Sequence, residues 1–492
     1  MRVVLASVVG LAACYNEAAV TPCTLTCEDS SCPAGLECMS DQICQTPGMP
    51  ICSTITGDGG GGGSGIYIKS TPANAGARFG TSVALSFDGN TLAVGAPGER
   101  FGGKSNAGAV YVFAWDGTKY ALLDRVVSQQ ADADDQFGAS VALSNDGMVL
   151  AVGVPGEDSG ATGVNGDEAN NAAPDSGAVF VYTRSGSTIT KSKYLKFGTT
   201  ATNAFYGTAV ALSGDGKLLA VTAPGPGNTL LSVLRWTLSS NTAPEAHPTM
   251  AEVDDRVGAS VAMPEDGSAV FAGASLDDTD ATGFTNNPAA PNNAMPDSGA
   301  MWYLGYSALY RFYFKPSNTG ANDNFGTAIA SSSSAAFLAV GAPLEDSNGT
   351  EANNSVVDSG AVYLFDEPST LSWLQSHYFK APAPATGDHF GQSVSLAGDG
   401  TLLVSGTPGR AGGGAAFVFE QATLGTWSAG PTLVGFNTEQ GDEFGSVVAV
   451  SRNRFVIAVG APGEAGGIVM TGGPPDPNNN SAPGAGAVYV FR

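Results

Sequence analysis

The chain has 492 residues, of which 43% are hydrophobic, and a formal net charge of −24. A chain this acidic is repelled by the phosphates of nucleic acids and by anionic lipid head groups, so its surface is not expected to bind either. Its 67 glycines and 28 prolines, together with the lack of helical periodicity after the first few residues, indicate an all-β class with many tight turns.

Residues 1–13 are predicted to be an export signal. Arg2 supplies a positive charge, and the apolar run that follows is too short to span a bilayer. The run ends Leu11-Ala12-Ala13-Cys14, which resembles the lipobox of bacterial lipoproteins. This resemblance implies cleavage before Cys14 and acylation of that cysteine, with an ordinary cleavable signal as the alternative.

Residues 14–56 contain all seven cysteines of the chain. With Cys14 as the lipid attachment point, six remain that can form disulfides: Cys23, Cys27, Cys32, Cys38, Cys44 and Cys52. This density in a segment too small for a core indicates three bridges in an oxidising compartment, although six cysteines allow fifteen pairings. A zinc site is the alternative, but the cysteines are loosely spaced and no histidine is nearby.

Residues 57–65 consist almost entirely of glycine and are predicted to be a flexible linker. The linker separates the cysteine-rich segment from residues 66–492, so the two parts are not expected to dock rigidly. Any membrane anchoring is expected to come from acyl chains on Cys14.

One pattern recurs seven times in residues 66–492: an apolar residue with glycine, an apolar run, a turn, and a second run ending near Gly-Ala-Pro. The glycine pairs are Phe79-Gly80, Phe137-Gly138, Tyr206-Gly207, Val257-Gly258, Phe325-Gly326, Phe390-Gly391 and Phe444-Gly445. The second runs end at Gly95-Ala96-Pro97, Gly153-Val154-Pro155, Ala223-Pro224, Gly273-Ala274-Ser275, Gly341-Ala342-Pro343, Gly406-Thr407-Pro408 and Gly460-Ala461-Pro462. A repeat of about 50–70 residues made of short strands predicts a propeller or solenoid, because each unit must stack on its neighbours.

The first copy shows how one unit is expected to fold. Residues 82–86 and 91–95 are apolar runs joined by Asp88-Gly89, which predicts a tight hairpin with positive φ at both central residues. Residues 108–113 form a third strand with bulky residues on both sides, as expected where both faces pack on neighbouring blades. The glycine beside the ring is expected to allow close backbone approach, and the proline is expected to end the second strand.

The two ends of the repeat region predict how it closes. The last copy stops at Arg492, just after its third strand, while residues 66–69 stand where an outer strand belongs. These residues are similar to other outer strands, such as residues 378–380. The N-terminal strand is therefore expected to complete the last blade, which gives a seven-bladed propeller with no unpaired ring edge.

The pattern across residues 66–492 resembles FG-GAP repeats, the units of the integrin α-chain β-propeller, which also occur in bacterial surface proteins. The third and fourth copies diverge from the pattern. The resemblance implies a seven-bladed propeller outside the cytoplasm with a role in adhesion or ligand binding, and it implies no particular reaction. The family's calcium loop between the first two strands is reduced here to a bare Asp-Gly turn, which lacks the six or more oxygens that calcium prefers.

A different acidic insert follows the second apolar run in the second, fourth and fifth copies. Each insert begins with oxygen-bearing residues at alternate positions and ends at Asp-Ser-Gly. In the fourth copy, Asp278-x-Asp280-x-Thr282-Gly283 follows the opening of a calcium loop but lacks the bidentate acid twelve residues from the start. The candidate metal ligands are Asp158, Asp175, Asp278, Asp280, Asp297, Asp346, Asn348 and Asp358. The alternative is a plain loop in which Asp-Ser-Gly forms an Asx turn, so calcium is the one cofactor that the sequence suggests without establishing it.

A second set of acidic residues stands just before the Phe-Gly pairs. Its members include Asp132, Asp134, Asp135, Asp254, Asp255, Asp323, Asp388, Asp442 and Glu443. Their recurrence predicts a shared structural role, the capping of backbone N–H groups at the start of each unit.

No catalytic residue is predicted. The chain has three histidines, His247, His377 and His389, and none has an evident partner in the sequence. The nucleophile-elbow motif Gly-x-Ser-x-Gly and the zinc-protease motif His-Glu-x-x-His are both absent. These observations favour a binding protein over an enzyme.

The sequence thus predicts a lipid-anchored protein of the bacterial cell envelope, in the outer membrane or on the cell surface. Its propeller is expected to be a non-enzymatic binding or adhesion module for a glycan or protein ligand. A structural envelope protein without a dedicated ligand is one alternative, and a propeller hydrolase or lyase is another.

Overall fold

The computed structural model describes residues 37–38, 44–45, 65–225, 232–247, 255–285, 293–305, 311–351, 353–369, 372–423, 425–466 and 480–492. The predicted signal at residues 1–13, the predicted lipid attachment at Cys14 and the predicted disulfide cysteines Cys23, Cys27, Cys32 and Cys52 lie outside these residues. Most of the linker, residues 57–64, also lies outside them. The described residues form strands and turns, and no helix among them is long and apolar enough to cross a bilayer.

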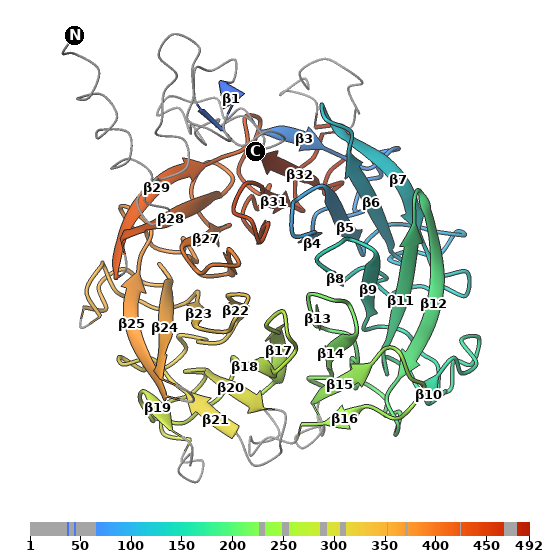
Figure 1. Ribbon diagram of the computed structural model, residues 1–492, viewed down its shortest axis with the longest axis horizontal. Coiled ribbons are helices and arrows are strands. Elements are labelled where there is room, and N and C mark those ends of the chain that lie inside the picture. Colours follow the sequence, from blue (N-terminus) through green and yellow to red (C-terminus); the bar gives the residue numbers. More distant parts are fainter. Residues whose placement is uncertain are drawn as a thin grey trace, which may run out of the picture. The chain divides into compact units, whose positions relative to one another are not determined.

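The chain divides into two compact units, residues 57–491 and residues 1–56 together with Arg492. In the smaller unit, β1 (Glu37–Cys38) pairs antiparallel with β2 (Cys44–Gln45), and the register places Cys38 directly opposite Cys44. The larger unit is a ring of seven antiparallel sheets (Figure 1). The predicted all-β seven-bladed propeller is therefore confirmed.

Each sheet is one blade, whose strands follow one another from the axis outward (Figure 1). Blade 1 contains β4 (Ser82–Leu85), β5 (Thr91–Ala96), β6 (Ala109–Trp115) and β7 (Tyr120–Val126). Blade 2 contains β8 (Ser140–Leu143), β9 (Val149–Val154), β11 (Ala178–Ser185), β12 (Thr188–Lys196) and β10 (Gly163–Val164). Blade 3 contains β13 (Val210–Leu212), β14 (Leu218–Thr222), β15 (Val233–Thr237) and β16 (Glu245–Ala246).

The remaining four blades complete the ring. Blade 4 contains β17 (Val257–Ala262), β18 (Ala269–Ala274), β20 (Ala300–Gly305), β21 (Arg311–Phe314) and β19 (Phe284–Thr285). Blade 5 contains β22 (Ala328–Ser331), β23 (Phe337–Ala342), β24 (Ala361–Ser369) and β25 (Ser372–Phe379). Blade 6 contains β26 (Ser393–Leu396), β27 (Leu402–Thr407), β28 (Ala415–Thr423) and β29 (Thr426–Leu433). Blade 7 contains β30 (Val447–Val450), β31 (Ile457–Ala461), β32 (Ala487–Phe491) and β3 (Ile66–Ile68).

The N-terminal strand β3 closes the ring as expected. It pairs antiparallel with β32 in the register Ile66 to Val490 and Ile68 to Val488. Strand β3 thereby becomes the outer strand of blade 7, while β30 at the inner end of the same blade contacts β4 of blade 1. The first and last repeats are therefore joined both at the axis and at the rim.

The hydrophobic core lies between blades rather than within one of them. The cluster around Phe137, for example, combines Val110 and Val112 of blade 1 with Val152 and Phe180 of blade 2. The aromatic residue of the Phe-Gly pair is fully buried in all six copies that have one, namely Phe79, Phe137, Tyr206, Phe325, Phe390 and Phe444. Because both faces of each sheet are covered, the second and third strands carry continuous apolar runs.

In six of the seven repeats, a glycine near the end of the second strand meets the Phe-Gly glycine of the next repeat across the blade boundary, and in the third repeat Thr222 takes its place. A Cβ atom on Gly95 of blade 1 would lie 2.0 Å from the carbonyl oxygen of Gly138 in blade 2. Gly138 itself adopts a φ of 89°, which a residue with a side chain rarely adopts. The expected close approach is confirmed. Five of the seven second strands end at the residue before the proline, as β5 does at Ala96, while β14 ends two residues before Pro224 and β18 is followed by Ser275.

The inner hairpin turns differ from the expected geometry. Only the glycine has positive φ, as at Gly89, where φ is 69°, so the prediction of positive φ at both central residues is wrong. The Gly89 amide donates to the Ser86 carbonyl, and the Ser86 amide donates to the Thr91 carbonyl, which makes a longer loop than a two-residue hairpin. Asp88 accepts hydrogen bonds from the Ser86 hydroxyl and the Asn90 amide, and these bonds hold the loop.

Seven backbone hydrogen bonds join these inner turns into a closed ring around the axis. In each, an amide of one blade donates to a carbonyl of the next over 2.8–3.1 Å. The pairs, donor first, are Phe87 and Asn145, Asn145 and Gly214, Gly214 and Glu265, Glu265 and Ser333, Ser333 and Gly398, Gly398 and Arg452, and Asn453 and Phe87. The inner ends of the blades are thus fixed to one another independently of strand β3.

Candidate functional site

The three acidic inserts leave blades 2, 4 and 5 between the second and third strands. Two of them return to their own blade, because β10 pairs with the outer strand β12 and β19 pairs with the outer strand β21. The sequence did not predict these fifth strands. The inserts are therefore partly ordered as sheet and are not simple projecting loops.

The base of each insert is closed by one aspartate. Asp158 Oδ1 accepts a hydrogen bond from the backbone amide of Asp175 at 2.8 Å. The same bond joins Asp278 to Asp297 at 2.7 Å and Asp346 to Asp358 at 2.8 Å. The aspartates whose backbone amides donate these bonds have positive φ, from 49° to 53°, so the accepting carboxylate stabilises a strained turn where the insert rejoins the blade.

A buried ion pair lies beneath each insert. The acidic residue just before the closing aspartate pairs with a lysine that ends the outer strand or directly follows that strand. The pairs are Glu157 with Lys196 at 2.6 Å, Asp277 with Lys315 at 2.8 Å, and Glu345 with Lys380 at 2.7 Å. Each lysine also donates to the serine of Asp-Ser-Gly, as Lys196 does to Ser176 Oγ at 2.7 Å. All six ionic side chains are buried, so the insert base is tied to the outer edge of its blade through the interior.

A tyrosine two residues before each lysine completes the cluster. The Tyr194 hydroxyl donates to Glu157 at 2.6 Å, and the Tyr313 hydroxyl donates to Asp277 at 2.6 Å. Burial raises the pKa of Tyr194, and the neighbouring Glu157 carboxylate raises it further. Burial lowers the pKa of Lys196, an effect that Glu157 opposes.

Three other blades carry versions of this pair. In blade 7, Lys69 after β3 pairs with Glu464. In blade 1, Arg125 pairs with Glu99 at 2.6 Å. In blade 6, Arg410 occupies the acidic position and pairs at 2.6 Å with Asp388, which stands just before the Phe390-Gly391 pair.

The aspartates before the Phe-Gly pairs have the predicted capping role. Asp135 accepts a hydrogen bond from the backbone amide three residues earlier at 2.7 Å. Asp323, Asp388 and Asp442 do the same at 3.0, 2.9 and 2.7 Å. This prediction is therefore confirmed for these four residues.

Capping aspartates also lie close to the buried ion pairs. Burial raises the pKa of Asp135 to about 7, and the charges of Glu157, Asp132 and Asp158 contribute to the rise. Burial likewise raises the pKa of Asp323 to about 7, with Glu345 as the next cause. Glu157 and Glu345 each pair with one lysine, so protonation of the nearby capping aspartate would remove an excess negative charge from the interior.

The predicted metal ligands do not gather into a calcium site. One carboxylate oxygen already accepts the hydrogen bond that closes the insert in each of Asp158, Asp278 and Asp346. The side chains of Asp280 and Asn348 are exposed. Within the described ranges, no three acidic, histidine or cysteine side chains are placed to share one ion. The residues as arranged do not fit the six or more oxygens that calcium prefers, and the hydrogen bonds support the loop interpretation instead.

The three histidines lie in three different blades. His247 follows β16 of blade 3 and is buried, and burial lowers its pKa. His377 is in β25 of blade 5, and His389 precedes Phe390 of blade 6. They do not converge on one place that could serve as a catalytic centre.

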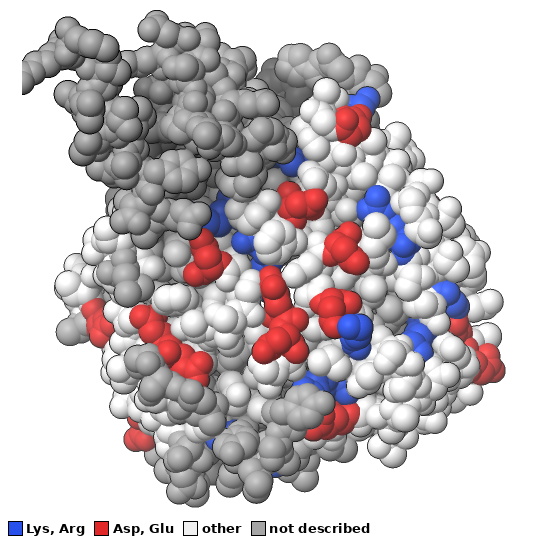
Figure 2. All heavy atoms as spheres, viewed as in Figure 1, with Lys and Arg blue, Asp and Glu red and all other residues white. Residues whose placement is uncertain are grey.

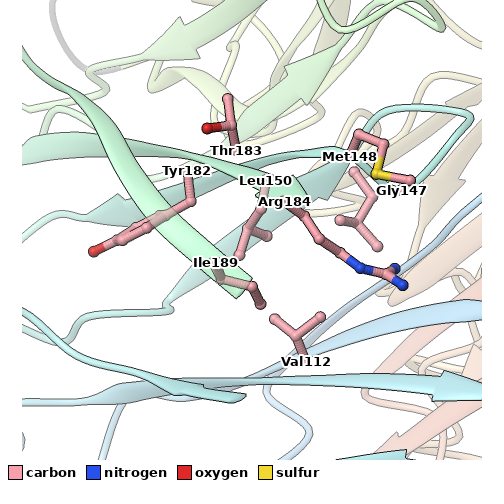
Figure 3. Close-up of a pocket in the computed structure, with 9 residues that line it drawn as sticks. Val112, Gly147, Met148, Leu150, Tyr182, Thr183, Arg184 and Ile189 are labelled. Atoms are coloured by element: carbon pink, nitrogen blue, oxygen red, sulfur yellow. The ribbon is translucent and has the colours of Figure 1, made fainter. Parts of the chain in front are cut away.

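A small pocket between blades 1 and 2 is shown in Figure 3. Its volume of about 10 Å³ leaves room for little more than one water molecule. The Tyr182 hydroxyl and the Arg184 guanidinium point to opposite sides in this view, and Arg184 donates to Thr91 Oγ1 at 2.8 Å. The pocket is an irregularity of packing and has no convergent polar groups.

The buried lysine and tyrosine residues were not predicted from the sequence. The signal was present, since Tyr-x-Lys recurs at Tyr67-Lys69, Tyr194-Lys196, Tyr313-Lys315 and Tyr378-Lys380. This motif indicated only the similarity of the outer strands. Its combination with an acidic residue after each second strand would have predicted the ion pairs.

Comparisons with known proteins agree with the fold. The FG-GAP repeat family matches residues 70–113, in blade 1, and residues 373–419, at the junction of blades 5 and 6. The chain therefore contains FG-GAP repeats arranged as a seven-bladed β-propeller. A search of curated proteins finds no match.

Two solved structures are similar to this chain at low sequence identity. A proposed 6-phosphogluconolactonase from Bacteroides uniformis is 12% identical with a TM-score of 0.45, covering 72% of this chain and 85% of that chain. The WD40 repeats of RRP9 are 12% identical with a TM-score of 0.46, covering 84% of this chain and 94% of that chain. Similarity at this level carries no information about function.

Proposed function

We propose that this protein is a non-enzymatic binding module displayed on the bacterial cell envelope, and that its propeller binds a glycan or a protein ligand through the acidic inserts. The observation that carries the proposal is the common base of the inserts in blades 2, 4 and 5. Each base is closed by an aspartate and tied to a buried lysine, so three variable loops are held by three equivalent rigid supports. Binding residues are often carried by loops on such a scaffold.

The FG-GAP repeats support a binding role by analogy with their use in adhesion. Display is inferred from the predicted signal, the predicted lipid at Cys14 and the linker before the propeller. Acidic side chains are spread over the face seen in Figure 2, with basic side chains among them, which suits hydrophilic partners.

A non-enzymatic role is favoured by the use that the structure makes of its ionisable groups. Glu157, Asp277 and Glu345 are buried in ion pairs, and Asp135 and Asp323 cap backbone amides. These groups stabilise the blades and do not face an open cleft where a substrate could be held.

The test is a binding screen of the purified chain against envelope glycans, extracellular matrix proteins and the surfaces of sibling cells. Variants in which residues 161–172 or 348–355 are replaced by short Gly-Ser segments should lose binding to the recognised ligand while remaining folded. A matched control shortens the exposed turn between β11 and β12, at residues 186–187, and should bind normally. Uniformly negative binding by the intact chain would overturn the proposal.

A further inference from the structure

The dipeptide Asn-Gly occurs twice in the chain, and both copies lie in the acidic inserts. Asn165-Gly166 directly follows β10 in the insert of blade 2, and Asn348-Gly349 is in the insert of blade 5. Such a dipeptide can react internally, because the backbone nitrogen of the glycine can attack the side-chain carbonyl carbon of the asparagine. Glycine favours this attack, since it has no Cβ atom to obstruct the approach and adopts a wide range of backbone conformations.

This reaction needs no reagent other than water. The glycine nitrogen forms a bond to Cγ of the asparagine and gives up its proton, while the Cγ–Nδ2 bond breaks and the departing nitrogen takes a proton to leave as ammonia. The product is a five-membered succinimide ring. Water then adds to one of the two ring carbonyls and breaks its bond to the ring nitrogen, which gives aspartate or isoaspartate. Ring closure therefore requires a side chain that can rotate and a glycine nitrogen that it can reach.

Asn348 and Gly349 meet both requirements. Both residues are exposed, and the Asn348 side chain makes no hydrogen bond with any residue that the structure describes. The Gly349 amide likewise donates to none of the described residues. Gly349 has a φ of 126°, and a Cβ atom there would meet nothing within 4 Å. The Asn348 amide donates to the Asn353 carbonyl at 3.2 Å, so the turn is held while the side chain of Asn348 stays free to rotate.

Asn165 has the same neighbour but not the same freedom. Its Oδ1 accepts a hydrogen bond from the Tyr194 amide at 2.9 Å, and its own amide donates to the Tyr194 carbonyl at 2.7 Å. The side chain must give up a hydrogen bond before Cγ can turn towards Gly166. Gly166 is also enclosed, since a Cβ atom there would lie 2.7 Å from Cβ of Ala161. Asn165 is itself exposed, so the hydrogen bond, and not exposure, distinguishes the two asparagines.

We propose that Asn348 is a site of spontaneous deamidation in the folded protein and that Asn165 is protected from this reaction. Deamidation converts Asn348 to aspartate or isoaspartate and adds a negative charge to the insert of blade 5. Isoaspartate also lengthens the backbone by a methylene group, so the insert acquires distinct chemical forms as the protein ages. The modification depends only on the geometry of the inserts, so it goes beyond the proposed function and does not rest on it.

Incubation of the purified, folded chain, followed by proteolysis and tandem mass spectrometry, tests the proposal. The residue at position 348 should gain the mass that accompanies replacement of an amide by an acid, and its peptide should separate into aspartate and isoaspartate forms. Asn165 should deamidate about tenfold more slowly, the factor that one additional hydrogen bond supplies. Asn348→Gln should retain its amide, because the longer side chain must close a larger ring, and this variant verifies the assignment.

The same incubation in guanidinium chloride is the matched control. Unfolding removes the hydrogen bond between Asn165 and Tyr194 and leaves both dipeptides intact, so the two asparagines should then deamidate at similar rates. The proposal is overturned if Asn348 in the folded chain reacts no faster than Asn165. It is also overturned if the difference between them persists in the unfolded chain, because the neighbouring sequence and not the fold would then set the two rates.

Discussion

Lys69 and Glu464 form a buried ion pair although 395 residues separate them in the sequence. Lys69 follows the N-terminal strand β3, and Glu464 follows β31 of the last repeat. Their pairing accompanies the register of β3 on β32. The same pair recurs within single repeats, so the junction of the two chain ends reproduces the interior of an ordinary blade.

Breaking this pair should destabilise the propeller strongly. Lys69→Met leaves Glu464 buried without its cation, which typically costs about 3–5 kcal/mol. The measurement is urea unfolding followed by tryptophan fluorescence. Arg78→Met is the control, since Arg78 and Glu443 form an exposed pair worth about 1 kcal/mol or less. Equal effects of the two substitutions would contradict the role assigned to Lys69.

The contact between the last and first repeats should not tolerate a methyl group. A Cβ atom on Gly460 would lie 2.1 Å from the carbonyl oxygen of Gly80. Gly460→Ala is therefore expected to lower stability by about 1–3 kcal/mol, because the Gly80 carbonyl is backbone and cannot rotate away. Gly198→Ala is the control, since a Cβ there has nothing within 4 Å. The midpoint of urea unfolding should hardly change in this control and should fall in Gly460→Ala.

The capping aspartates should make stability depend on pH near neutrality. The folded state raises the pKa of Asp135 to about 7, above the ordinary value of 3.8, so the native protein binds more protons than the unfolded chain between these values. Stability from this group is then fully present below about pH 4 and declines as the pH rises towards 7. Asp135→Asn keeps an oxygen for the amide of Asp132, and it should raise stability at pH 8 by roughly 1–3 kcal/mol.

Asp215 provides the opposite control for the pH experiment. Hydrogen bonds from Lys217 and Ser213 lower the pKa of Asp215 to about 2, so its contribution is present above pH 4 and is lost in acid. Asp215→Asn should therefore leave the decline between pH 5 and 8 unchanged. Thermal melts across this range check both variants, and a steeper decline in Asp135→Asn would count against the assignment.

Calcium should not stabilise the inserts. Each leading aspartate already accepts the closing amide, and the described acidic groups do not form a ligand set. Melting temperatures measured in millimolar calcium and in chelator are expected to agree within about 1 °C, since a ligand that binds the native state raises the midpoint with its concentration. A concentration-dependent rise would restore the metal hypothesis, and substitution of Asp278, Asp280 or Asp297 would then locate the site.

The repeat pattern was sufficient to predict the ring because each part of the motif has a local physical reason. A fully buried aromatic residue, a glycine with positive φ and a proline near the strand end recur at six of the seven blade junctions, and the fourth copy keeps only the glycine. The fifth strands β10 and β19 could not be predicted, since each is only two residues long and has no periodic signal. The ion pairs were missed because their partners lie on different strands, and a single copy gives no reason to connect Glu157 with Lys196.

The position of β3 has a consequence for how the molecule is made. This strand is translated before the first repeat, but its hydrogen-bonding partner β32 belongs to the seventh. Blade 7 consequently cannot be completed until β32 has been made, although β3 has been available since before the first repeat. The ring therefore closes late, and until then the sheet edge that β3 and β32 share lacks its pairing and is open to other strands.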